Sequence, residues 1–136
     1  MKRLFSTSCT DGAFSFATLV LRLGAGLLIM IQHGLDKLMH FNRIAPHFAN
    51  PFHAGPTASL ALVIFAELFC SAFVVLGLFT RLACIPLIIN LATALLLAHK
   101  GQFFGPGELA GIYLTCFVVL LFTGPGNVSL DRFIGK

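Results

Sequence analysis

A glutamate, Glu67, lies near the middle of an apolar stretch, Ala58–Phe79, that is long enough to cross a membrane. A carboxylate at that depth costs about 2.5–3.5 kcal/mol even on a lenient insertion scale. A buried partner or a water-filled cavity must offset this cost. Glu67 is therefore the first candidate for proton transfer or ligand binding, because ionisable residues inside a membrane usually mark functional sites.

Four polar residues in the other apolar stretches lie at depths comparable with that of Glu67. Counted at the ~1.5 Å rise per residue from the end that carries the termini, Arg22 and Asn90 lie roughly 12 Å deep and Glu67 about 18 Å deep, with Tyr113 and Thr115 at similar levels. Because arginine stays charged and bonds carboxylates in a bidentate manner, we expect an Arg22–Glu67 contact. Asn90 and Tyr113 would bond the remaining polar groups. The pair either fixes the helix register or belongs to a polar site for a ligand or a proton.

A second polar group lies at the opposite ends of the same stretches and consists of His33, Lys37, His99 and Glu108. Arg22, His33 and Lys37 share one helix face, since eleven residues return close to the same face and four make one turn. Two histidines and a carboxylate are a known metal-binding set, but no local ligand spacing supports it here. We predict no metal site and expect this outer rim to exchange protons or to bind headgroups, with His33 a second candidate for proton transfer.

The composition is that of an integral membrane protein. Of the 136 residues, 57% are hydrophobic and only 10% are charged, and the mean hydropathy is +0.93. Soluble domains are about 25% charged, so the chain has room for one membrane domain and no separate soluble one. The net charge is +4. Because the basic residues are scattered singly, nucleic-acid binding is not expected.

Four apolar stretches predict an all-α bundle of four membrane-spanning helices, forming one domain over residues 1–136. The predicted spans are Phe14–Met39, Ala58–Phe79, Leu82–Ala98 and Leu109–Thr123. A span needs about 20 residues, so the last two must tilt or use flanking residues. The connection over residues 40–57 is long and carries aromatic residues at roughly helical spacing. We expect either an amphipathic segment at the outer membrane surface or a lid over a site.

The basic residues predict that both termini are cytoplasmic. The terminal end would carry Lys2, Arg3, Arg81, Arg132 and Lys136, against Lys37, Arg43 and Lys100 at the other end. The N-terminal residues lack the apolar core of a secretory signal, and we interpret them as a cytoplasmic tail. Three of the four cysteines then lie in the cytoplasmic half, without a Cys-x-x-Cys pair. This favours small core fillers over a thiol–disulfide enzyme of the outer face.

These motifs, taken in order, resemble the DoxX family of small bacterial membrane proteins. The resemblance runs from Leu21 to Phe133 and rests on Leu21-Arg22-Leu23, His33-Gly34-Leu35-Asp36-Lys37-Leu38, Ala66-Glu67-Leu68, Leu76-Gly77-Leu78-Phe79-Thr80-Arg81-Leu82-Ala83, Asn90, Glu108-Leu109, and Gly124-Pro125-Gly126 followed by Ser129-Leu130-Asp131. It implies a four-helix bundle in the bacterial inner membrane. Some family members are similar to subunits of thiosulfate:quinone oxidoreductase, and others are partners in membrane oxidoreductase complexes linked to thiol or oxidative stress.

With this resemblance, we expect an accessory or quinone-linked subunit of a membrane oxidoreductase system. A quinone carbonyl would accept a hydrogen bond from Arg22 or Asn90. Glu67 or His33 would take part in proton transfer. Two alternatives remain: a transporter or binding module for a small molecule or lipid, with the outer rim as its entrance, and a purely structural partner subunit. The expected partners are membrane lipid, another membrane or peripheral oxidoreductase subunit, and a second copy of the chain, which glycine and alanine on the span faces would permit.

Overall fold

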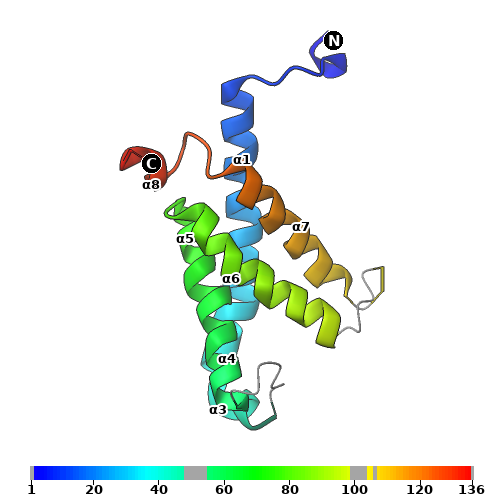
Figure 1. The fold of residues 1–136 in the computed structure, drawn as a ribbon, viewed down its shortest axis with the longest axis vertical. Coiled ribbons are helices and arrows are strands. Elements are labelled where there is room, and N and C mark those ends of the chain that lie inside the picture. Colours follow the sequence, from blue (N-terminus) through cyan, green and yellow to red (C-terminus); the bar gives the residue numbers. More distant parts are fainter. Residues whose placement is uncertain (1, 48–54, 99–103, 106, 136) are drawn as a thin grey trace.

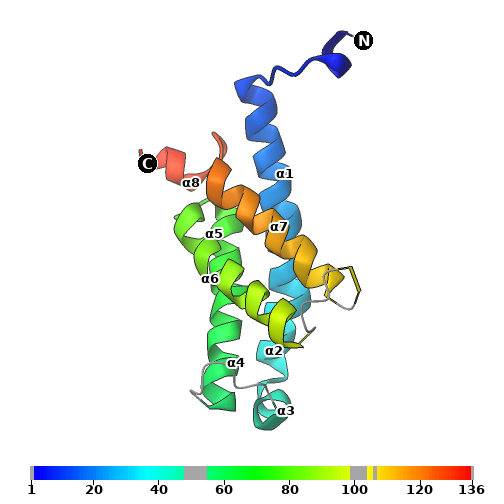
Figure 2. The same ribbon diagram turned by 45° about the vertical axis from the view of Figure 1, so that its right-hand side comes forward.

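The structure is a computed structural model that describes residues 2–47, 55–98, 104–105 and 107–135. Its regular elements over these residues are all helical. Two long helical rods run antiparallel, and two shorter helices, α6 (Thr80–Thr93) and α7 (Glu108–Thr123), lie across them (Figures 1 and 2). The N- and C-terminal segments lie at one end of the molecule, here named the terminal end, and α3 lies at the other, the loop end (Figure 1).

The first rod, span one, is continuous from Asp11 to Met39. It consists of α1 (Asp11–Ile29), a π-helical segment η2 (Met30–Leu35) and α2 (Asp36–Met39), and a short 3-10 turn η1 (Lys2–Phe5) precedes it. The helix begins at Asp11 because the Thr10 hydroxyl accepts a hydrogen bond from Ala13 N at 3.1 Å, which satisfies one of the free N–H groups of the first turn. The predicted span therefore starts three residues too late.

The second rod, span two, runs from Pro56 to Leu76. It consists of α4 (Pro56–Ile64), a π-helical segment η4 (Phe65–Cys70) and α5 (Ser71–Leu76). Pro56 stands in the first turn, where its missing N–H removes no hydrogen bond. Gly77 ends the rod in the left-handed conformation, with φ 72°, and turns the chain into the next helix. The predicted span extends three residues too far into this hairpin.

Spans three and four form the shorter pair. Span three consists of α6 (Thr80–Thr93) and the π-helical segment η5 (Ala94–Ala98), and span four is α7 (Glu108–Thr123). Both begin within two residues of the predicted positions. The two rods and Thr80–Leu97 are long and apolar enough to cross a membrane. The 16 residues of α7 are fewer than the ~20 that a perpendicular span needs. The predicted all-α membrane bundle, with a short fourth helix, is confirmed.

All four spans meet in one apolar core. Its buried members are Ala25, Ile29, Cys70, Val74, Ala83, Cys84, Leu87, Leu91, Tyr113, Phe117 and Leu120. The thiols of Cys70 and Cys84 are free and buried, as the prediction of small core fillers requires. Large side chains such as Phe16, Phe69 and Phe122 are exposed on the outer faces. Such faces suit hydrocarbon, because lipid tails are as apolar as the side chains that they would contact.

The described part of the first connection is amphipathic. It forms α3 (Phe41–Ile44) and a 3-10 turn η3 (Ala45–His47). Phe41, Ile44 and Ala45 pack against the apolar cluster that includes Leu60 of α4, whereas Arg43 is exposed. The choice between a segment at the membrane surface and a lid over a site stays a prediction. Residues 48–54, on which the rest of that prediction falls, lie outside the described residues.

Candidate functional site

Each of the first three spans contains one π-helical segment: η2, η4 and η5. In such a segment the backbone hydrogen bonds join residues five apart, which inserts extra chain into the α-helix. The segments η2 and η4 pack against each other. π-Helical turns inside α-helices are rare and frequently mark functional sites. Here Glu67 lies in η4, so the buried carboxylate sits where two spans depart from regular α-helix.

The backbones of span one and span two touch at this level. A Cβ atom at Gly34 in η2 would lie 2.7 Å from both the backbone carbon and the backbone oxygen of Glu67. Glycine therefore permits the close approach. The Ser71 hydroxyl donates to the backbone oxygen of Glu67 and, at 3.1 Å, to that of Leu68. The serine thus bonds carbonyl groups in the segment where the regular helical ladder is interrupted.

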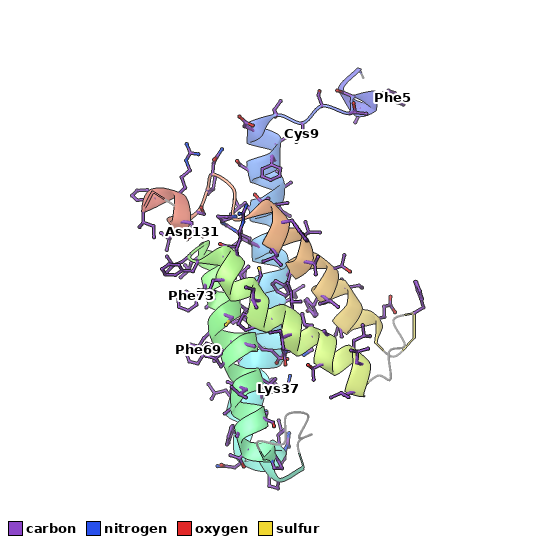
Figure 3. The ribbon with its side chains drawn as sticks, in the orientation of Figure 1. Phe5, Cys9, Lys37, Phe69, Phe73 and Asp131 are labelled. Atoms are coloured by element: carbon purple, nitrogen blue, oxygen red, sulfur yellow. The ribbon has the colours of Figure 1, made fainter. Side chains whose placement is uncertain are left out.

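The carboxylate of Glu67, a residue 6% exposed, has side-chain partners on two other spans. Lys37 Nζ lies 2.6 Å from Oε2, and the Asn90 amide donates to Oε1 at 3.0 Å. Lys37 lies beside the second rod (Figure 3). An ion pair together with a hydrogen bond offsets the cost of burying both charges. The prediction that Asn90 forms a hydrogen bond within this group of polar residues is confirmed.

The predicted Arg22–Glu67 contact is wrong. Arg22 is 2% exposed, and its guanidinium donates to the backbone oxygens of Pro125 at 3.0 Å and Val128 at 2.7 Å, at the terminal end. The physical reason is helix direction, because a helical side chain leans toward the N-terminus of its own helix. Span one runs away from the terminal end and span two runs back. Arg22 therefore leans away from Glu67, while Lys37 and Glu67 lean toward each other.

A pocket of about 340 Å³ lies beside the ion pair, and all four spans contribute to it. Its apolar lining residues are Ile29, Leu91, Ala94, Leu109 and Ala110, and its polar ones are His33, Lys37, Glu67 and Tyr113. The rings of His33 and Tyr113 meet edge to face, with centroids 5.8 Å apart and planes at 83°. Mainly apolar pockets of about 300–1,000 Å³ with a few convergent polar groups are typical of small-molecule sites.

Two further predicted residues, Thr115 and Glu108, do not line this pocket. Thr115 is exposed, and its hydroxyl donates to a backbone oxygen of its own helix at 2.8 Å, so its assignment to the polar core is wrong. Glu108 is exposed at the start of α7, one residue before the pocket-lining Leu109. His99 lies outside the described residues. Over the part of the chain that the structure describes, no group of three His, Cys, Asp or Glu residues is placed to hold a metal ion.

Three residues of the site have roles that sequence reasoning missed. Lys37 was assigned to the outer rim, but it is the charge partner of the buried carboxylate. The signal that identifies Lys37 as the partner is the direction of the side chains, because each points toward the N-terminus of its own helix. Ser71 lies four residues after Glu67, on the same helix face, which is also a usable signal. Gly34 lies near the end of span one, and a glycine inside a helix can indicate that another backbone approaches closely there.

A second buried polar cluster, at the terminal end, holds the C-terminal segment against the bundle. Asp131, in the short helix α8 (Leu130–Phe133), accepts hydrogen bonds from Phe79 N at 2.7 Å and Thr80 N at 3.0 Å. Its own N–H donates to Gly77 O at 2.8 Å. Asp131 lies at the hairpin between α5 and α6 (Figure 3). The carboxylate therefore caps the N-terminus of α6 from a distant part of the chain.

Comparison with known proteins gives a family match and several relatives. A family model described as DoxX matches residues 17–100. An uncharacterised membrane protein of Mycobacterium tuberculosis is 29% identical, with 88% of this chain and 82% of the relative covered. The inner membrane protein YphA of Escherichia coli is 31% identical over 79% of this chain and 84% of its own. An uncharacterised protein of Haemophilus influenzae is 36% identical, covering 76% and 81%. No solved structure matches the chain.

Proposed function

Because the chain belongs to the DoxX family of membrane proteins, we propose that its pocket binds a quinone headgroup and that it acts as an accessory, quinone-linked subunit of an inner-membrane oxidoreductase system. The observation that carries the proposal is one pocket that combines apolar walls with an ammonium, a carboxylate, an imidazole and a phenol. These groups gather inside a protein whose outer faces suit lipid, which is the phase where quinones dissolve.

The residues of the pocket fit a quinone in size and in hydrogen-bonding capacity. A quinone ring is flat and apolar on its faces and carries two carbonyl acceptors. The pocket is lined by Lys37 and Tyr113, whose side chains carry hydrogen-bond donors. A volume of about 340 Å³ accommodates such a headgroup. When bound, the quinone would supply two-electron, two-proton redox chemistry, with its electrons coming from a partner subunit.

The protein's own groups would then hold charge and move protons. Glu67 keeps the Lys37 ammonium inside the pocket through the 2.6 Å ion pair. Histidine exchanges protons near neutral pH, and His33 lines the same pocket one helical turn before Lys37. Lys37 and Tyr113 replace the donors expected earlier, because Arg22 lies at the terminal end and the Asn90 amide already serves Glu67.

Filling the pocket is expected to remove bound quinone. Ala94 lines the pocket, so Ala94→Phe places a ring inside it. Protein purified from bacterial membranes in mild detergent should carry quinone detectable by mass spectrometry of an organic extract. The variant should carry at least about tenfold less, which corresponds to a loss of about 1.4 kcal/mol of binding free energy.

The matched control is Ala61→Phe. Ala61 is exposed on α4, so this variant introduces the same side chain on an outer face of the protein. It should retain the quinone. Equal quinone content in the two variants would refute the assignment to this pocket. Wild-type protein that carries no quinone and binds no added soluble analogue would refute the function itself. Recovery of another apolar molecule, lost only in Ala94→Phe, would favour a binding or transport module.

We also propose that both termini face the cytoplasm, which places the loop end outside. In a chain whose native cysteines are replaced by alanine, Asn42→Cys should react with a membrane-impermeant maleimide on intact spheroplasts. Asn127→Cys should react only after lysis. Both positions are exposed, in α3 and in the C-terminal segment, so access to reagent decides the outcome. The reverse labelling pattern would turn the pocket toward the cytoplasm.

A further inference from the structure

The short helix α8, near the end of the chain, carries one exposed apolar face. This face consists of Leu130, Phe133 and Ile134, which are three and four residues apart and therefore lie on one side of the helix. A backbone hydrogen bond from Ile134 N to Leu130 O, at 3.0 Å, keeps Ile134 on the same turn. Phe133 is 90% exposed, and the other two side chains are exposed beside it. An apolar environment would therefore stabilise this face.

Hydrogen bonds through Asp131 fix α8 at the hairpin that joins span two and span three. The Asp131 carboxylate accepts from Phe79 N and Thr80 N, and its own N–H donates to Gly77 O at 2.8 Å. A hairpin between two membrane spans lies at the edge of the hydrocarbon. Leu82, two residues into span three, is already exposed and apolar, as a lipid-facing position is. The helix α8 therefore lies at the level of the membrane interface.

The position of α8 is beside the bundle and not on top of it. In both views of the molecule α8 projects sideways at the terminal end (Figures 1 and 2). Asp131 attaches it to the hairpin on its inner side (Figure 3). In a membrane, the space beside the spans is filled by lipid. The helix α8 therefore overhangs the lipid that surrounds the bundle.

Arg132 shows which side of α8 faces away from the lipid. At 3.6 residues per turn, Arg132 lies opposite the apolar face. Its guanidinium donates to Asn127 Oδ1, and Asn127 N donates to Ser15 Oγ at 3.3 Å. Ser15 precedes Arg22, which lies against Gly77 of the hairpin, by seven residues, or about 10 Å toward the terminal end. Arg132 therefore reaches away from the hydrocarbon, and the apolar face of α8 turns toward it.

We propose that α8 is an interfacial anchor whose partner is the lipid surface at the terminal end. Its apolar face enters the boundary between headgroups and acyl chains, and Arg132 stays on the water side. Amphipathic helices bind membranes in this way, with the apolar face about 5–10 Å deep. The same segment supplies Asp131 to the hairpin, so lipid contact and the cap on α6 support each other.

The chain contains no tryptophan, so a single introduced indole reports on its own surroundings. Phe133→Trp places the indole on the apolar face, and Arg132→Trp places it on the opposite side of the same turn as a matched control. Both positions are exposed, so neither change disturbs the core. Each variant is reconstituted in phosphatidylcholine vesicles and quenched by phosphatidylcholine brominated on its acyl chains, or by aqueous acrylamide. Compared with position 132, position 133 should be quenched about threefold more by the brominated lipid and about threefold less by acrylamide.

Equal quenching of the two positions by brominated lipid would overturn the orientation of α8. Strong quenching of both by acrylamide, with little by brominated lipid, would place α8 in water and overturn the anchor. Protection of position 133 from both quenchers would mean that protein, such as a second copy of the chain, covers the apolar face in place of lipid. None of these outcomes depends on quinone or on which end faces the cytoplasm, so the test is independent of the proposed function.

Discussion

Gly34→Ala is expected to destabilise the protein by about 3 kcal/mol, the upper part of the usual range for overpacking. The added Cβ would lie 2.7 Å from the backbone carbon and oxygen of Glu67. Backbone atoms cannot rotate away as the end of a side chain can, so span one and span two must separate. The same movement pulls Lys37 away from Glu67, and ligand binding in the pocket should fall together with stability.

Gly24→Ala is the matched control on the same span, because no heavy atom lies within 4 Å of the Cβ that it adds. Alanine is the better helix former by up to about 1 kcal/mol, so this variant should be neutral or more stable. Thermal unfolding in detergent, followed by circular dichroism, measures both variants. If both alanine variants unfold at the same temperature, the two spans do not approach as closely as the structure places them.

Glu67→Ala is expected to cause the second large loss, because it leaves the Lys37 ammonium without its counterion. Removing one partner of a buried ion pair costs about 3–5 kcal/mol in soluble proteins. The cost should be smaller here, since the long lysine side chain can extend to the membrane surface and the unfolded state also lies in lipid. Unfolding in detergent should therefore shift to clearly lower temperature. Lys37→Met in the same chain should restore part of the loss.

The control for that pairing is Arg22→Met combined with Glu67→Ala. This double variant should be less stable than Glu67→Ala alone, because the backbone oxygens of Pro125 and Val128 lose their donor. Rescue by Arg22→Met, together with no rescue by Lys37→Met, would reverse the assignment of partners.

The helices were predictable because apolar length is a strong signal in a membrane protein. Four apolar stretches became four helices, and their limits differ from the prediction by at most three residues. The errors at the ends have local causes: the Thr10 cap starts span one early, and the left-handed Gly77 stops span two early. Both are effects of single residues, which an average over a long apolar stretch does not register.

The candidate site was predictable in its centre and less so in its partners. The cost of burying a carboxylate identified Glu67 as a residue that needs polar partners, and Asn90 is one of them. Matching depths along the helix axes chose Arg22 instead of Lys37, because the depth of a Cα atom ignores the length and lean of the side chain. Thr115 was assigned by depth alone, and its position on the helix circumference turns it away from the site.

The π-helical segments were not predictable in this way. The sequences of η2 and η4 contain polar residues and a glycine, but these residue types do not distinguish a π-helical segment from an α-helical one. At Gly34, the distinguishing feature is the close approach to the Glu67 backbone of the neighbouring span. A pattern of residue types along one helix carries no information about a neighbouring backbone.

The cap on α6 has a consequence for the order in which the protein is made. The backbone N–H groups of Phe79 and Thr80 are bonded by Asp131, which is synthesised about fifty residues later. While span three enters the membrane, Asp131 has not yet been added, so these two groups lack the partner that they have in the complete protein. The hairpin in the middle of the sequence is therefore among the last places where the molecule is completed. A chain that ends before Asp131 contains all four spans, but the hairpin between span two and span three lacks the carboxylate that accepts its two hydrogen bonds.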